Sequence, residues 1–254
     1  MTKRLKAVEL FLAAGLAVGI TAGMTACSGA GETDADIGVA PDETVEVAEG
    51  GEGGEGGEGS DYTEGEQANA DFQDKLSGEA LLTALQEGGH VIYFRHAQTE
   101  KDYADQADPN MSLDDCETQR KLNDVGIAQS EEIGAAFTAK EIPVGEVITS
   151  EYCRAWKTAD LAFGTYEKNP KLNFLPFEDY TDAQVEEMKA NVTPLLTAAP
   201  AAGTNTIIVG HDDIFEAATG IYPDPQGIAY VLTPDGNGGF TLQANVLPEE
   251  WAEL

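Results

Sequence analysis

The sequence predicts an α/β domain in which helices cover both faces of a central sheet. Short apolar runs alternate with longer stretches of helical periodicity, and polar or glycine residues follow each run. This alternation is typical of strands connected by crossover helices. The chain before residue 71 has a different composition, so we place the domain at residues 71–254.

The predicted elements begin with a helix and a strand. Ser77 is a suitable N-cap for a helix that carries leucines at helical spacing and ends at the pair Gly88-Gly89. The apolar run His90–Phe94 follows directly and predicts a buried strand.

The rest of the domain repeats this alternation and ends in a hairpin. Apolar positions at helical spacing predict the helices, and β-branched runs predict the strands. The expected elements are a helix from Asn123 to Phe137, a strand at Glu146–Thr149, helices at Tyr152–Phe163 and Asp182–Leu196, a strand at Thr206–Val209, and a hairpin of Ile228–Thr233 with Gly239–Val246.

The first residues have the layout of a secretory signal. Basic residues precede an apolar stretch from Leu10 to Ile20, and small residues then lead to Cys27. The stretch resembles a bacterial lipoprotein signal, which is cleaved before a cysteine that carries the lipid. We therefore expect a signal peptide at residues 1–26 and a membrane anchor at Cys27, outside the cytoplasm. An uncleaved membrane-spanning helix is the alternative, although the apolar run is shorter than the roughly 20 residues that a span needs.

Residues 27–70 predict an acidic, disordered tether. They contain no lysine or arginine, and a Gly-Gly-Glu repeat runs through Glu49–Gly59. Such a segment buries too little apolar surface to order itself, and its like charges extend it. Calcium binding by the glutamates is an alternative reading.

The formal net charge of −32 makes nucleic-acid binding improbable, because recognition of a phosphate backbone needs clustered lysine and arginine. The few cations therefore matter individually. Three predicted strands end beside cationic or titratable residues, namely Arg95 and His96, Arg154, and His211. Ligands of α/β sheets bind beyond the carboxyl ends of the strands, so these residues are candidates for one site.

These residue types suit phosphoryl transfer. A neutral imidazole can attack phosphorus, and arginine forks match phosphate oxygens. Histidines beside arginines make a poor metal site, because neighbouring cations oppose the binding of another, so we expect neither metal nor cofactor.

The same residues resemble the histidine phosphatase superfamily, which includes phosphoglycerate mutase-like enzymes. The resemblance covers most of residues 88–221 and consists of four blocks in order: Phe94-Arg95-His96-Ala97, Leu122-Asn123-Asp124-Val125-Gly126 with Gln129, Ser150-Glu151-Tyr152-Cys153-Arg154-Ala155 with Thr158-Ala159, and Gly210-His211. It implies a three-layer α/β/α sandwich with a mostly parallel sheet. It also implies a metal-independent phosphomonoesterase that acts on a small phosphorylated substrate.

The resemblance assigns roles to individual residues. His96 is the expected nucleophile, and a phosphohistidine is the expected intermediate. Arg95, Arg154 and His211 are expected to bind the phosphate. Asp212 is the first candidate for the acid that protonates the leaving group, and three alternatives stay open: Glu178, Asp179 and Asp213. Ala97 departs from the family pattern, which has glycine there, and we expect activity to survive this change.

Two cysteines remain once Cys27 is assigned to lipid. An even pair in an oxidising compartment is readily a disulfide, so Cys116 and Cys153 are candidates for one. Cysteine-based phosphatase chemistry is a poorer reading of Cys153, since Arg154 follows it directly and leaves no loop of backbone amides between them.

The leading interpretation is thus an extracytoplasmic phosphatase of the bacterial cell envelope, with envelope phosphosugars among the expected substrates. The alternative is a catalytically inactive phosphate-binding module on the cell surface.

Overall fold

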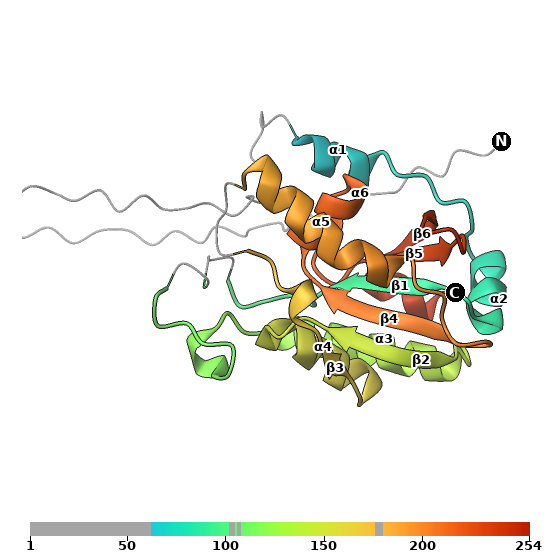
Figure 1. The fold of residues 1–254 in the computed structure, drawn as a ribbon. Helices are drawn as coiled ribbons and strands as arrows, with labels where there is room; N and C mark the ends of the chain where they lie inside the picture. Colours follow the sequence, from blue (N-terminus) through green and yellow to red (C-terminus); the bar gives the residue numbers. More distant parts are fainter. Residues whose placement is uncertain (1–61, 102–104, 106–107, 176–179) are drawn as a thin grey trace, which may run out of the picture. The chain divides into compact units, whose positions relative to one another are not determined.

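A six-stranded sheet in the order β3-β2-β4-β1-β5-β6 forms the centre of the computed structural model (Figure 1). The structure describes residues 62–101, 105, 108–175 and 180–254. The strands are β1 (Val91–Arg95), β2 (Val144–Thr149), β3 (Glu167–Lys168), β4 (Asn205–Gly210), β5 (Ala229–Pro234) and β6 (Phe240–Val246). Among these, β5 alone runs against the others, since it pairs antiparallel with both β1 and β6. The predicted α/β class with a mostly parallel sheet is confirmed.

Helices cover both faces of the sheet, which gives three layers (Figure 1). One face carries α2, α3, α4 and a C-terminal 3-10 helix, and the other carries α1, α5 and α6. The helices are α1 (Glu64–Ala70), α2 (Glu79–Glu87), α3 (Asp124–Ala139), α4 (Cys153–Phe163), α5 (Asp182–Leu196), α6 (Asp212–Thr219), and the 3-10 helices η2 (Cys116–Thr118), η3 (Pro170–Leu172) and η4 (Pro248–Ala252).

Strand β1 is buried on both faces, as its continuous apolar sequence requires. Alternate side chains point to opposite layers. Phe94 packs against Trp251 of η4 with ring centroids 5.6 Å apart, whereas Tyr93 packs against Phe215 of α6 at 4.7 Å. The strand that precedes the candidate nucleophile is therefore held from above and below.

Helix α1 lies within the segment that the sequence predicts to be a disordered tether. A capping box begins it, in which the Thr63 hydroxyl accepts from the Glu66 amide and the Glu66 carboxylate accepts from the Thr63 amide. Its buried Gly65 lies so close to Glu216 of α6 that a Cβ atom would clash with that side chain. Helix α1 therefore packs onto the domain, and the folded region begins before residue 71.

The predicted signal peptide, Cys27 and the rest of the tether lie outside the described residues. Across the part of the chain that the structure describes, each helix is too short or too polar to cross a membrane.

Candidate active site

His96 follows β1 directly and is almost completely buried, at 1% exposure. Its Nδ1 atom lies 2.9 Å from the carbonyl oxygen of Ala97, which can only accept a hydrogen bond, so Nδ1 carries a proton. Burial lowers the pKa of His96 well below its usual value, and Arg154, Arg120 and Arg95 lower it further. The ring is therefore neutral, and its Nε2 atom holds a free electron pair.

The start of α3 fixes the segment after His96. The N-cap residue Asn123 donates its side-chain amide to Gln98 and to the carbonyl oxygen of Thr99. A Cβ atom at Gly126 would lie 2.0 Å from the carbonyl oxygen of Gln98, so this close approach requires glycine. The Asn-Asp-Val-Gly block thus positions the loop that follows His96.

Ala97 fits this loop without crowding. It is fully buried, and its amide donates to the hydroxyl of Thr158 on α4 at 3.0 Å. That amide is engaged inside the fold and does not depend on a glycine at position 97.

His211 follows β4 and is equally buried. The hydroxyl of Tyr93 accepts from the His211 amide and donates to the His211 carbonyl oxygen, at 2.9 and 2.7 Å. Gly210 permits this contact, since a Cβ atom there would lie 2.2 Å from the hydroxyl. The rings of His96 and His211 then meet edge to face, with centroids 5.4 Å apart.

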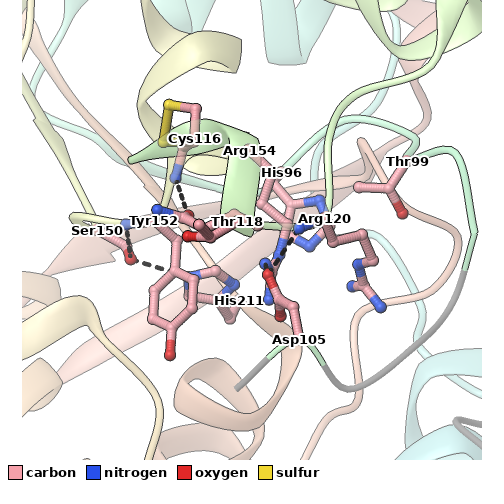
Figure 2. Close-up of polar contacts among 12 residues, drawn as sticks. His96, Thr99, Asp105, Cys116, Thr118, Arg120, Ser150, Tyr152, Arg154 and His211 are labelled. Atoms are coloured by element: carbon pink, nitrogen blue, oxygen red, sulfur yellow. Dashed lines mark hydrogen bonds and ion pairs between the residues drawn. A yellow bond between two sulfur atoms is a disulfide. The ribbon is translucent and has the colours of Figure 1, made fainter. Parts of the chain in front are cut away.

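A chain of hydrogen bonds sets the proton on His211. The side-chain amino group of Asn173 donates to the Glu151 carboxylate at 2.7 Å, which identifies the other side-chain atom as the oxygen, Oδ1. This Asn173 oxygen accepts a hydrogen bond from the Ser150 hydroxyl at 2.9 Å. The Ser150 oxygen must therefore accept from Nε2 of His211, at 2.8 Å (Figure 2). Burial lowers the pKa of His211 well below its usual value, and Arg154 and His96 add to the effect. Neutral His211 consequently keeps Nδ1 unprotonated, and a hydrogen bond from Nδ1 to phosphate requires a second proton.

Arg154 lies in the first turn of α4 and is 2% exposed. Its guanidinium lies 4.8 Å from the ring centroid of Tyr152 and 5.3 Å from that of Phe174. The carboxylate of Asp105 pairs with it at 2.8 Å (Figure 2). Burial and nearby Arg120 lower the pKa of Arg154 from its usual value. This arginine is therefore desolvated and charge-paired inside the site.

A disulfide joins Cys116 and Cys153, and it ties the loop before α3 to the start of α4. Gln119 adds a second link, because its side-chain oxygen accepts from the Cys153 amide at 2.8 Å. That amide is one of the unpaired donors of a helix start, so Gln119 caps α4 beside Arg154.

Arg95 ends β1 and contacts a strap at residues 222–224. It donates to the Pro223 carbonyl oxygen at 3.1 Å and pairs with the Asp224 carboxylate at 3.0 Å. It also pairs with Asp212 at the start of α6, at 2.5 Å, and lies over the Tyr222 ring. The guanidinium of Arg95 is therefore held by partners on two segments of the fold.

Asp212 is an anion in this arrangement. Burial alone would raise its pKa, but Arg95 and the Tyr222 hydroxyl, which donates at 2.8 Å, hold the pKa at about 2. Of the other candidate acids, Asp213 accepts from the Tyr180 hydroxyl at 3.4 Å, while Glu178 and Asp179 lie outside the described residues.

The structure adds two residues that the sequence analysis did not single out. Arg120 is 3% exposed, and its charge acts on both His96 and His211. Asp105 is 1% exposed and accepts from the Arg120 amide at 2.8 Å. The position of Arg120, two residues before the Leu122-Asn123 block, is a signal that could have indicated it. No pattern in the sequence marks Asp105.

These groups bring together a buried neutral imidazole, arginines and carboxylates at the carboxyl edge of the sheet, a set of residues whose charge and hydrogen-bond donors suit a phosphoryl group. Within the described ranges, no group of three or more His, Cys, Asp or Glu is arranged to hold a metal ion.

Residues 91–216 match the family model of the histidine phosphatase superfamily, branch 1. The protein belongs to this superfamily, and phosphatase activity is what the family indicates. None of the curated proteins matches the sequence.

Solved structures similar to this chain include three phosphatases. The protein histidine phosphatase SixA complexed with tungstate is 16% identical, with 63% of this chain and 98% of that chain covered and a TM-score of 0.45. Phosphoserine phosphatase from Entamoeba histolytica, in complex with 3-phosphoglyceric acid, is 14% identical, with 61% and 95% covered and a TM-score of 0.46. The alpha-ribazole phosphatase from Shigella flexneri is 17% identical, with 61% and 95% covered and a TM-score of 0.44.

Proposed function

We propose that the protein is a metal-independent phosphomonoesterase that forms a phosphohistidine on His96 and acts outside the cytoplasm on a small phosphate ester. The observation that carries this proposal is the contact of the buried His96 ring, through Nδ1, with the Ala97 carbonyl oxygen. Because Nδ1 donates to Ala97 and burial keeps the ring neutral, Nε2 is a ready nucleophile.

The reaction then has two steps. Nε2 of His96 attacks phosphorus, the bond from phosphorus to the ester oxygen breaks, and the leaving oxygen takes a proton from Asp212. Water then attacks phosphorus, the bond from phosphorus to Nε2 breaks, phosphate leaves, and one proton of the water returns to Asp212. Arg95 and Arg154 stabilise the charge on the equatorial oxygens, and His211 joins them when its Nδ1 atom gains a second proton.

Asp212 is the acid in this proposal, although its carboxyl group is ionised at rest. A bound phosphate dianion competes with Asp212 for Arg95, which removes the main interaction that lowers its pKa. Substrate binding thereby favours the protonated form that the first step needs. Glu178, Asp179 and Asp213 remain alternative donors.

A panel of phosphomonoesters, including phosphorylated sugars, tests the activity. We expect released phosphate with chelator present, loss of turnover in His96→Ala, and labelled phosphate trapped on the parent protein after acid-free quenching. Thr138→Ala removes a hydroxyl that donates to the Gly134 carbonyl oxygen near the C-terminal end of α3, and it serves as a control away from the site. Failure of the folded parent to hydrolyse any ester would contradict the proposal.

The rival function is a catalytically inactive phosphate-binding module. The pairing of Arg95 and Arg154 with carboxylates favours the inactive module, because both guanidinium groups are already paired within the protein. Phosphate binding without turnover or a trapped phosphohistidine would support the module.

The location is also a proposal. We infer a lipid anchor on Cys27 in the bacterial cell envelope, and the Cys116–Cys153 disulfide supports exposure to an oxidising compartment. Metabolic labelling with a radioactive fatty acid should mark the parent and not Cys27→Ser. Equal labelling of both would contradict the anchor.

A further inference from the structure

The Asp105 carboxylate is paired with Arg154, the residue proposed to bind the substrate phosphoryl group. Its Oδ2 atom lies 2.8 Å from the Arg154 guanidinium and 2.8 Å from the Arg120 amide. Figure 2 shows its side chain pointing toward the cluster of His96, Arg120, Arg154 and His211. A carboxylate and a phosphoryl group offer the same kind of oxygen to an arginine fork, so they compete for one donor.

The ion pair of Asp105 and Arg154 has fewer hydrogen bonds than a permanent structural pair needs. Oδ1 of Asp105 and Nε of Arg154 are both buried, and neither has a hydrogen-bond partner among the described residues. A buried ion pair offsets the cost of desolvation only when its remaining polar atoms are also bonded. The pair therefore leaves unused acceptor and donor capacity at the point where a phosphoryl group would bind.

We propose that Asp105 is an internal ligand of Arg154 that the substrate phosphoryl group must displace. The inference rests on the proposed function, because it assumes that Arg154 binds the substrate phosphoryl group.

Displacement of Asp105 weakens the binding of every anion in the same proportion, because only the fraction of molecules in which Arg154 is free of Asp105 can bind one. A monoanion such as acetate replaces one carboxylate by another at Arg154 and gains no charge. A phosphate dianion brings a second negative charge and further oxygens and so binds the freed Arg154 more tightly. We therefore expect phosphate binding to stay measurable in the parent and acetate binding to fall below detection.

The test measures anion binding to the full chain by calorimetry at pH 8, with inorganic phosphate and with acetate. Asp105→Asn keeps the size of the side chain and removes its charge. We expect phosphate to bind about tenfold more tightly to this variant, and acetate binding to become measurable. Asp105→Glu keeps the charge and should retain the weaker binding of the parent.

Asp114→Asn is the matched control, since it removes the same charge from an exposed position of the same loop. It should bind phosphate as the parent does. Equal or weaker phosphate binding by folded Asp105→Asn would overturn the proposal, as would an equal gain in Asp114→Asn.

A second measurement uses the unaltered protein, in case Asp105→Asn does not fold. Carbodiimide coupling to glycinamide labels accessible carboxylates, and peptide mass spectrometry reads each site. Asp105 should be protected without phosphate and labelled at least about fivefold more when phosphate saturates the protein, because displacement exposes it. Unchanged protection at saturation would overturn the proposal.

These results separate the two proposals. A gain in phosphate affinity without turnover supports displacement of Asp105 and contradicts the phosphatase mechanism. Turnover without any gain in affinity contradicts displacement alone.

Discussion

The two arginines of the site are both buried, yet they are anchored differently. Arg95 contacts the strap at residues 222–224 and Asp212, so several groups from two segments fix its position. Arg154 lies against aromatic rings and pairs with one described carboxylate, that of Asp105. The strap contacts still hold Arg95 when phosphate competes for Asp212, whereas Arg154 keeps no described carboxylate once Asp105 is exchanged. We therefore regard the Arg95 half as the fixed part of the site and the Arg154 half as the part that responds to substrate.

The largest effect is expected from Arg154→Ala. It should lower kcat/KM at least about a hundredfold, as loss of one donor to a charged transition state does. It should also destabilise the fold, because Asp105 is left as a buried, unpaired charge. Kinetics with a phosphomonoester and urea unfolding measure the two losses.

The double variant Arg154→Ala/Asp105→Asn sharpens this prediction. It should recover stability without recovering activity, since it removes the unpaired charge but restores no phosphate ligand. Equal stability of the single and double variants would contradict the exchangeable pair.

Removal of the disulfide should act mainly on the Arg154 half. The bridge closes a loop with a sequence separation of 37, so replacing both cysteines by serine should lower the free energy of unfolding by about 3–4 kcal/mol. Denaturant titration of the parent with and without reductant gives the same comparison without mutation. An unchanged midpoint would show that Gln119 and the surrounding packing hold the start of α4 in place without the disulfide.

The pairing of Asp212 with Arg95 predicts a pH-dependent stability. The pKa of Asp212 falls from 3.8 to about 2 in the folded protein. The resulting stabilisation, about 2 kcal/mol, is present above pH 4 and is lost as the pH falls through about 2. Asp212→Asn should flatten the stability curve over this window, measured by urea unfolding at each pH. A curve parallel to that of the parent would contradict the pairing.

The smallest effect is expected at α1, which supports the fixed half from outside. The side chain of Asn69 donates to the Asp224 carbonyl oxygen at 2.9 Å and accepts from the Tyr230 hydroxyl. Asn69→Ala should therefore cost about 1 kcal/mol of stability and raise KM a few-fold with kcat unchanged. Gln67→Ala, on the same helix, contacts Asp71 instead and should leave KM unchanged. Equal KM values in the parent, Asn69→Ala and Gln67→Ala would show that α1 does not support Arg95.

Most of the fold follows from local sequence signals. The helix Asp182–Leu196 has the predicted bounds, Asn123 caps α3, and the strand before His96 is shifted by one residue. Helix α1 was not predicted, because its composition is polar and its stability depends on docking against α6. Strand order was also out of reach, since it depends on contacts between segments far apart in the sequence.

The residues of the candidate site also divide into those that local sequence signals locate and those that only the tertiary structure places. His96, Arg95, Arg154 and His211 follow strand ends or begin a helix, so periodicity and the family pattern locate them. Asp105 reaches the site from a loop without periodicity, so only the folded chain places it beside Arg154. Which partner each charged group takes is a property of the tertiary structure and not of any one segment.

The burial of His96 has a consequence for acidic surroundings. Many enzymes that use histidine lose their base near pH 6.5, but this imidazole stays unprotonated well below that value. The second ionisation of a phosphate monoester falls near pH 6. The acidic limb of the rate profile would then report the charge of the substrate, and hydrolysis would fade in acid because the ester becomes a monoanion while the nucleophile remains competent.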